Sequence, residues 1–362
     1  MLNRVYNFSA GPSTLPLSVM QKIKEDFLDY NGTGTSIIEI SHRNKIFKDI
    51  LHSAKSLFRK LANLPKNYKI LFMHGGAQMQ FSAVPLNLMS REGGKGSYFI
   101  TGRWGLLAEK EAQRFGNTEI LLDGKIYNYK RIPEFKKISL DIESSYAHIT
   151  TNNTLYGTRW NTFPNTGKVP LIADATSDIL SRVMDYSKFG IVYAGLQKNL
   201  GVSGTAIVII REDLIGNALP KTPKLLDYEV MYKEDSLPNT INTFAVYVMN
   251  LVTEWIKNQG GVEKMEILAK KKAQLLYNIL DNSGFYKKIA YPHHRSDMNV
   301  TFDIKNKNML KKFITNSEKE GFFGLTGHQI VGGVRASIYN AMPLEGVKEL
   351  TLFMKEFEKK NG

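Results

Sequence analysis

The sequence predicts an α/β protein in which a large, doubly wound, mostly parallel mixed sheet is joined to a smaller α+β region. Short β-type runs alternate with helical stretches from about residue 68 to residue 215. Several of these runs are apolar without polar alternation, which is typical of strands covered on both faces. After about residue 260 the pattern changes to longer helices separated by single strands. Together these observations favour one doubly wound domain followed by a small domain.

The strands of the large domain are expected where apolar and β-branched residues cluster between turns. They are predicted at 69–73, 97–100, 119–122, 146–149, 169–173, 190–193 and 205–210. An amphipathic helix over 46–61 precedes the first of them. Only a tight glycine turn separates the run at 205–210 from the residues before it, which suits an antiparallel neighbour, so we expect a mixed sheet.

A long helix over 243–259 is expected to lead out of the large domain. Helices over 262–282, 309–320 and 344–359 and strands over 299–303 and 333–338 then form the small one. We therefore expect an N-terminal segment at 1–15 near the active site or the small domain. The large domain is expected at 16–260 and the small domain at 261–362.

Composition excludes several classes of protein. The 362 residues contain no cysteine, which removes disulfides, thiolate metal sites and a cysteine nucleophile. No apolar stretch reaches the ~18 residues that a membrane span needs. The N-terminus lacks the apolar core of a signal peptide. A cytoplasmic protein without a membrane partner is the resulting expectation.

The net charge of +14 raises the question of nucleic-acid binding. The lysines are scattered along predicted helix faces, and no dense basic block is interleaved with aromatic residues, so no nucleic-acid partner is expected. Part of the excess charge could attract acidic substrates. The adjacent His293 and His294 diverge on a strand and have no cysteine partner, so no metal site is expected.

A lysine and an aspartate end two neighbouring apolar runs. Lys198 follows 190–193 in a glycine-bounded loop, and Asp174 ends the run at 169–173. Pyridoxal phosphate chemistry needs such a pair: the amine forms a Schiff base with the cofactor aldehyde, and the carboxylate keeps the pyridine nitrogen protonated. The alternatives are a solvated loop lysine at Lys198 and, at Asp174, a carboxylate paired with an arginine such as Arg182.

Other strand ends carry residues that suit the same ligand. The first strand runs into Gly75 and Gly76 and then a helix, which offers free backbone N–H groups to a phosphate. Trp104 follows the second strand and could stack on a flat ring, and Thr154 could donate to a ring substituent. Each also has an ordinary explanation as a tight turn, a core tryptophan or a polar loop. The combination, in this order along one sheet, is far more specific than its parts.

Three segments carry candidate substrate contacts. Residues 8–12 are a rigid start bounded by glycine and proline, and His42 and Arg43 stand side by side before a helix. Arg335 lies in an apolar strand after a glycine-rich turn and is the best candidate for binding a substrate carboxylate bidentately. Surface or structural ion pairs are the alternatives for Arg43 and Arg335.

At this point the chain resembles one family closely, the phosphoserine aminotransferases of the class-V pyridoxal-phosphate aminotransferases. The resemblance extends from end to end, and the stretches around Lys198 and Arg335 are highly specific together. The matching segments are 8–12, 41–43, 75–87, 101–104, 152–154, 173–182, 193–199, 238–240 and 331–346.

The resemblance implies a type I fold of pyridoxal-phosphate enzymes and a role for each matching residue. Lys198 would be the Schiff-base lysine and proton shuttle, and Asp174 the partner of the pyridine nitrogen. Cofactor contacts would come from Trp104 on the ring, Thr154 on its hydroxyl, and Ala77, Gln78 and Gln197 on the phosphate. Substrate anions would be bound by His42, Arg43, His328 and Arg335. Asn239 and Thr240 would reach the cofactor of the neighbouring subunit, which implies a homodimer with shared sites.

The sequence departs from the family pattern at two positions. Position 78 is glutamine where some members carry arginine, and members differ there. Gln329 replaces an arginine that usually helps to bind the substrate phosphate or the glutamate side-chain carboxylate. The lost charge is expected to weaken anion binding by ~1–2 kcal/mol unless another lysine or arginine compensates.

The activity that the resemblance implies is reversible amino transfer from L-glutamate to 3-phosphohydroxypyruvate, giving O-phospho-L-serine and 2-oxoglutarate in serine biosynthesis. A role in pyridoxine synthesis stays open. The alternative within the fold is an aminotransferase with a different or broader acceptor, such as a serine– or alanine–glyoxylate aminotransferase. The alternative outside the enzymes is a basic RNA-binding protein. A desulfurase is excluded because it needs a reactive cysteine.

Overall fold

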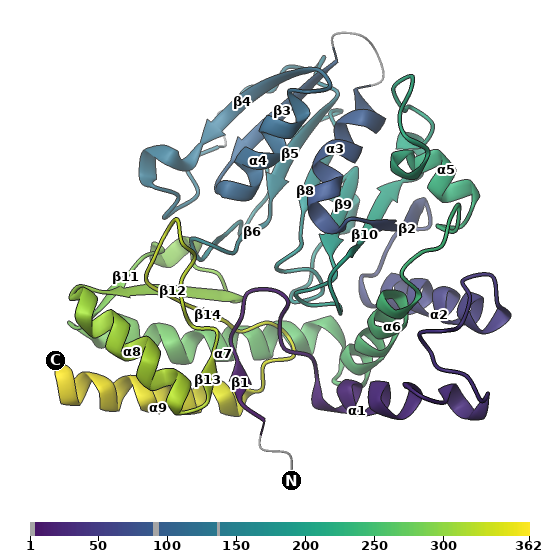
Figure 1. Ribbon diagram of the computed structural model, residues 1–362. Coiled ribbons are helices and arrows are strands. Elements are labelled where there is room, and N and C mark those ends of the chain that lie inside the picture. The colour runs from purple at the N-terminus through teal and green to yellow at the C-terminus, as the bar shows by residue number, and fades with distance from the viewer. Residues whose placement is uncertain (1–3, 90–93, 136–137) are drawn as a thin grey trace.

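A seven-stranded mixed sheet forms the centre of the computed structural model, which describes residues 4–89, 94–135 and 138–362 (Figure 1). The strand order is β2-β10-β9-β8-β5-β3-β4. Strand β10 is antiparallel to both of its neighbours, and the other pairings are parallel. The strands are β2 (Tyr68–His74), β3 (Lys95–Ile100), β4 (Asn117–Asp123), β5 (Tyr146–Thr150), β8 (Leu171–Asp174), β9 (Ile191–Gly195) and β10 (Thr205–Arg211). The predicted mixed sheet and its antiparallel strand are confirmed.

Helices cover both faces of this sheet, which explains the apolar runs without alternation. Alternate residues of β2 point to opposite faces: Leu71 packs with α3 (Gly76–Leu88), α4 (Arg103–Ala112) and α5 (Tyr228–Lys233). Ile70 and Phe72 pack on the other side, with α2 (Lys45–Leu61) and α6 (Thr243–Asn258). The short helix α1 (Leu17–Asp26) packs against α6.

The C-terminal part is an α+β layer with its own apolar cluster. A three-stranded antiparallel sheet of β11 (Tyr286–Lys288), β12 (Asn299–Ile304) and β14 (Val334–Ser337) packs with α7 (Gly261–Asn282), α8 (Lys307–Lys319) and α9 (Leu344–Asn361). The N-terminal segment joins this layer, because β1 (Tyr6–Asn7) pairs in parallel with β13 (Phe322–Phe323). Residues 1–3 of the expected segment 1–15 lie outside the described residues.

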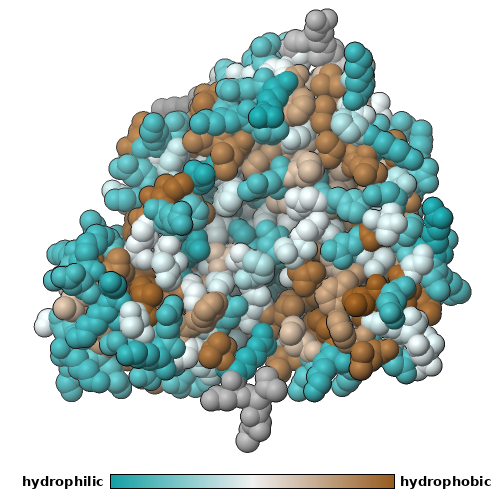
Figure 2. All heavy atoms as spheres, in the orientation of Figure 1, coloured by the Kyte–Doolittle hydropathy of each residue, from teal (hydrophilic) through white to brown (hydrophobic). Residues whose placement is uncertain are grey.

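Charged side chains are distributed over the surface, and several of them form ion pairs with side chains of opposite charge. Hydrophilic residues gather over α8 and α9 at the lower left of Figure 2. Lysines there pair with carboxylates four residues earlier in the chain, as in Lys307–Asp303 and Lys360–Glu356. Within the described ranges no helix is long and apolar enough to cross a membrane, and no group of three or more histidine, aspartate or glutamate side chains is arranged to hold a metal ion.

Candidate active site

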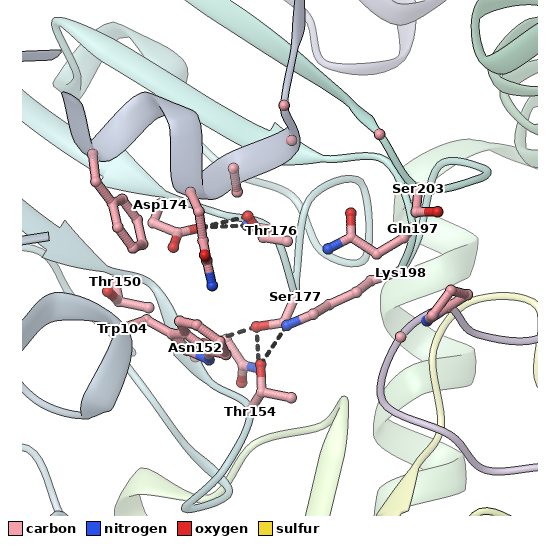
Figure 3. A pocket seen from close by; sticks show the side chains of 18 residues that line it. Trp104, Thr150, Asn152, Thr154, Asp174, Thr176, Ser177, Gln197, Lys198 and Ser203 are labelled. Carbon is pink, nitrogen blue, oxygen red and sulfur yellow. Dashed lines mark hydrogen bonds between the residues drawn. The ribbon is translucent and has the colours of Figure 1, made fainter. Parts of the chain in front are cut away.

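A cavity of about 300 Å³ lies at the carboxyl ends of the parallel strands, where α/β sheets bind ligands (Figure 3). Its walls come from six separate stretches of the chain. The lining residues are Gly11, Pro12, Gly75, Gly76, Ala77, Gln78, Phe81, Trp104, Thr150, Asn152, Thr154, Asp174, Thr176, Ser177, Gln197, Lys198, Ser203 and Gly204. Seven of the thirteen predicted site residues are therefore brought together in one cavity: Ala77, Gln78, Trp104, Thr154, Asp174, Gln197 and Lys198.

Lys198 enters the cavity from the turn that follows β9. Its Nζ donates a hydrogen bond of 2.6 Å to Thr154 Oγ1, which follows the short strand β6 (Asn152–Asn153). Burial lowers the pKa of Lys198 to about 8. The negative charge of Asp174 opposes that fall, and the positive charge of Arg335 adds to it. Since only the unprotonated amine is a nucleophile, this environment prepares Lys198 to attack an aldehyde near neutral pH.

Asp174 is the last residue of β8, and its carboxylate is almost fully buried. Its Oδ1 accepts hydrogen bonds from the Thr176 backbone N–H at 3.0 Å and from Thr176 Oγ1 at 2.5 Å. Burial raises the pKa of Asp174, and the two Thr176 bonds offset part of the rise. The arginine alternative is wrong, because Arg182 is 2.9 Å from Asp178 instead. Oδ2 has no hydrogen-bond partner among the described residues, so Asp174 is available to a donor in the cavity.

The Gly75–Gly76 turn opens α3 beside the cavity. Both glycines have positive φ angles, 83° and 66°, which residues that carry a Cβ rarely adopt. The Gly75 N–H is bonded to the Gly204 carbonyl at 3.0 Å, which holds the turn against the loop after Lys198. No side chain caps the helix, so the N–H groups of its first turn, including that of Gln78, are available to an anion.

Four further polar atoms of lining residues are buried without partners among the described residues. They are Nε1 of Trp104, at the start of α4, Oγ1 of Thr150, Oδ1 of Asn152 and Oε1 of Gln197. Unpaired buried polar atoms are rare in native proteins, so these atoms are available to a polar ligand in the cavity. Thr176 and Ser177 were not singled out from the sequence. Their position directly after Asp174 at a strand end was the available signal.

The N-terminal segment closes one side of the cavity. Gly11 lies so near Lys198 that an added Cβ would be 3.4 Å from Lys198 Cγ. Ser13 donates its backbone N–H to the Gln197 carbonyl at 3.0 Å and its hydroxyl to the Lys198 carbonyl at 2.5 Å. Residues 8–12, singled out from the sequence as a rigid start, thus lie directly against the lysine loop.

Arg335 and His328 lie within electrostatic reach of the cavity but outside its lining. Arg335 is partly buried in β14, and its Nε is buried without a hydrogen-bond partner. Burial lowers the pKa of His328, and the positive charges of Arg335 and Arg103 lower it further. Gln329 is exposed. A cationic group therefore borders the site, and among the described residues Arg335 has no carboxylate partner.

The remaining predicted residues lie away from this cavity in the single chain. His42 is buried and Arg43 exposed, just before α2. Asn239 Oδ1 is 3.1 Å from Nε2 of His74, the residue before the glycine turn, and Thr240 is exposed. None of these four residues lines the cavity that contains Lys198, although Asn239 contacts the neighbour of the lining residue Gly75.

Comparison with known proteins agrees with this geometry. The family model described as Aminotransferase class-V matches residues 5–350. The phosphoserine aminotransferase of Geobacillus kaustophilus is 47% identical over 360 residues, 99% of each chain. That of Bacillus anthracis is 46% identical and covers 100% of both chains.

Solved structures give the same result. Phosphoserine aminotransferase from Bacillus circulans subsp. alkalophilus superposes with a TM-score of 0.97 at 43% identity, covering 99% of each chain. The pyridoxal-phosphate-bound phosphoserine aminotransferase of Trichomonas vaginalis gives 0.92 at 33% identity, over 97% of this chain and 100% of that one. A ureidoglycine–glyoxylate aminotransferase from Bacillus subtilis shares only the fold, with 14% identity and a TM-score of 0.78. The chain belongs to the phosphoserine aminotransferase family of the class-V aminotransferases.

Proposed function

We propose that this protein transfers the amino group of L-glutamate reversibly to 3-phosphohydroxypyruvate, with pyridoxal phosphate as cofactor. The observation that carries the proposal is a buried lysine amine and a buried carboxylate facing one cavity beside an uncapped helix N-terminus. The full-length similarity to phosphoserine aminotransferases supports this acceptor over glyoxylate, since the glyoxylate enzymes share the fold alone. We further infer a cytoplasmic enzyme of serine synthesis.

The cavity fits pyridoxal phosphate at each of its polar ends. The first turn of α3, with Ala77, Gln78 and the nearby Gln197, suits the phosphate, and the free oxygen of Asp174 suits the ring nitrogen. Trp104 offers an aromatic face for the ring, and Thr154 a hydroxyl for the ring oxygen. When bound, the cofactor supplies an aldehyde that condenses with amines and a ring that withdraws electrons.

The protein's own groups then bind, orient and move protons. Asp174 holds a proton on the ring nitrogen, because an ionised carboxylate in a buried site is stabilised by a cationic donor. Lys198 has a pKa near neutrality, so its amine both accepts the α-proton of the amino acid and returns it. Thr154 Oγ1 accepts a hydrogen bond from Nζ and so orients that amine. One site serves both half-reactions, so we expect ping-pong kinetics.

The substrate anions are assigned to Arg335 and His328. Arg335 binds the α-carboxylate, and His328 contributes a hydrogen bond to the side-chain anion. His42, Arg43, Asn239 and Thr240 do not line the cavity of their own chain, which supports a homodimer in which they serve the partner's cavity. Gln329 leaves the site with one cation fewer than its relatives usually carry.

We also propose that the chain divides into the segment 1–15, a large domain at 16–260 and a small domain at 261–362. The apolar clusters of the large domain extend to Val262 and Met265, and that of the small domain begins at Ala273, which supports a division near residue 260. Most of the second cluster comes from residues 273–357, and Phe8 of the N-terminal segment belongs to it.

Borohydride reduction of the cofactor-loaded protein followed by peptide mapping tests the chemistry. The pyridoxyl label should lie on Lys198, and Lys198→Ala should carry no label and show no turnover. A label on another lysine would overturn the assignment.

Side-by-side turnover with 3-phosphohydroxypyruvate, glyoxylate and pyruvate tests the acceptor. The phosphorylated acid should give the highest kcat/KM. Preference for an uncharged acceptor would refute the phosphoserine assignment while leaving the cofactor chemistry intact.

A further inference from the structure

Lys272 is a buried lysine that the proposed reaction does not use. It lies on α7, is 2% exposed, and donates hydrogen bonds from Nζ to the carbonyls of Tyr339 at 2.6 Å and Met342 at 3.0 Å. In the described part of the chain no carboxylate pairs with it. Burial lowers its pKa to about 7. A buried amine costs free energy unless its donors are satisfied. The two loop carbonyls satisfy them here, so the amine and the loop stabilise each other.

That loop connects β14, which carries Arg335, to α9. Tyr339 Oη donates to the carbonyl of Ala10 at 2.9 Å and accepts from Asn299 Nδ2 at 3.2 Å. Asn299 Oδ1 accepts from Asn152 Nδ2 at 2.9 Å, and Asn152 lines the active-site cavity. One end of the loop is thus joined by hydrogen bonds to the cavity wall and to the N-terminal segment.

The next residue of the loop reaches the lysine loop itself. The Asn340 backbone N–H donates to Asn199 Oδ1 at 3.1 Å, and Asn199 follows Lys198 in the chain. Asn340 Nδ2 donates to the Leu180 carbonyl at 2.9 Å. Asn199 Nδ2 in turn donates to the Ser177 carbonyl at 3.2 Å, beside Asp174. Residues 339–340 therefore connect the small-domain strand bearing Arg335 with the loop bearing Lys198.

We propose that Lys272 is a positioning residue for the reaction: by fixing the 339–342 loop it sets Lys198 and Arg335 at the separation that the substrate requires. The inference rests on the proposed function for its kinetic consequence. Misplacing a reacting group by about 1 Å can slow a step on the order of 100-fold. Even the neutral amine has two N–H donors, which match the two carbonyl acceptors. Holding the loop therefore requires the N–H donors of the amine but not its positive charge.

The chain allows a selective test of that polar head. It contains no cysteine, so Lys272→Cys introduces a single thiol. Lys272 also lines a second cavity of about 460 Å³, bordered by Arg4, Trp255 and Met342, through which small reagents can reach the thiol. Alkylation with 2-bromoethylamine rebuilds a side chain of lysine length with its amine. Alkylation with 1-iodopropane builds one of the same length that ends in a methyl group.

The cofactor-loaded variant is measured in three forms: unmodified, aminoethylated and propylated. We expect kcat of the unmodified and propylated forms to fall about tenfold or more, and kcat of the aminoethylated form to return to within about twofold of wild type. The pH midpoint of the absorbance band of the Lys198-bound cofactor should shift in the unmodified and propylated forms. It should return to the wild-type value in the aminoethylated form. The control is Lys271→Cys, at the adjacent exposed residue of α7. Its kcat and absorbance midpoint should not change when its thiol is alkylated with either reagent.

Equal kcat and equal absorbance midpoints for the aminoethylated and propylated forms would overturn the proposal, since Lys272 would then only fill space. So would a Lys272→Met variant that keeps wild-type kcat and midpoint, which covers the case of an unreactive thiol. Wild-type protein that shows no amino transfer would instead contradict the proposed function. In that case the absorbance midpoint still decides the positioning role.

Discussion

Replacing Asp174 by asparagine separates what the carboxylate does for the reaction from what it does for the fold. The change keeps the shape and leaves Oδ1 in place to accept both Thr176 hydrogen bonds. Only the second oxygen changes, from an anionic acceptor that faces the cavity to an N–H donor. A protonated ring nitrogen would then meet a donor, so the ring would lose its proton and its ability to withdraw electrons.

The expected loss combines two contributions. One hydrogen bond to a charged group is lost, about 1.5–3 kcal/mol, and one buried donor is left unpaired, about 1–3 kcal/mol. The sum of about 2.5–6 kcal/mol corresponds to a fall in kcat on the order of 10²–10⁴. The assay is the initial rate of 2-oxoglutarate formation at saturating substrates, with cofactor content measured by absorbance.

Stability should change in the opposite direction. Burial raises the pKa of Asp174 above its unfolded value, so ionisation of this group opposes folding as pH rises through the folded pKa. Asp174→Asn removes that penalty, and the cofactor-free variant should melt at a higher temperature than cofactor-free wild type at neutral pH. Turnover within tenfold of wild type, or a lower melting temperature of the cofactor-free form, would refute the reasoning.

Asp178→Asn is the matched control. Asp178 is also buried, but it is paired with Arg182 at 2.9 Å. Removing one member of a buried pair leaves the other uncompensated, so this variant should lose about 3–5 kcal/mol of stability. It should retain turnover within a few-fold, because Asp178 does not line the cavity.

Three further outcomes follow from the geometry of the site. Acetylation of Lys198 in the cofactor-free protein, followed by mass spectrometry, should reach half its maximal rate near pH 8. Burial lowers the pKa of Lys198 to about 8, and the reactive amine is the form that exists above that pH. A midpoint near the ~10.4 of free lysine would contradict the buried site. Arg335→Ala should raise KM for both substrates roughly 10–100-fold with cofactor content unchanged, and an effect on only one substrate would exclude a role in binding the shared α-carboxylate. Gly76→Ala should lose about 1–2 kcal/mol of stability and also weaken cofactor binding in an absorbance titration, whereas Gly34→Ala, with an equally open position and a φ of 74°, should lose stability alone.

The sheet could be predicted from the sequence because burial on both faces leaves a local trace. Strand β10 lacks polar alternation since Ile207 and Val208 meet helices on opposite sides. Its antiparallel direction followed from the short glycine turn before it. By contrast, the pairing of β1 with β13 joins Tyr6 to Phe322, and two-residue strands carry no period that a sequence could display.

The placement of Lys198 and Asp174 in one cavity was also predictable, because both residues end apolar runs at which charge is unexpected. The residues that hold them were not. Ser13 contacts the Lys198 carbonyl across 185 residues, and Tyr339 contacts Ala10 across 329. The suggestion that Arg182 neutralises Asp174 failed because Arg182 pairs with Asp178, four residues before it. The contacts of Ser13 and Tyr339 are decided by tertiary packing and leave no local pattern.

The N-terminal segment has a consequence for the order in which the enzyme is built on the ribosome. Phe8 donates its N–H to the Phe323 carbonyl at 2.7 Å, and its own carbonyl accepts from the Ser337 N–H at 3.2 Å. The residues that close the cavity beside Lys198 are thus synthesised long before their partners Phe323 and Ser337. Until then the chain holds an unpaired N-terminal arm and an open site. The contacts that hold this segment against the small domain therefore form only after residue 337 has been synthesised.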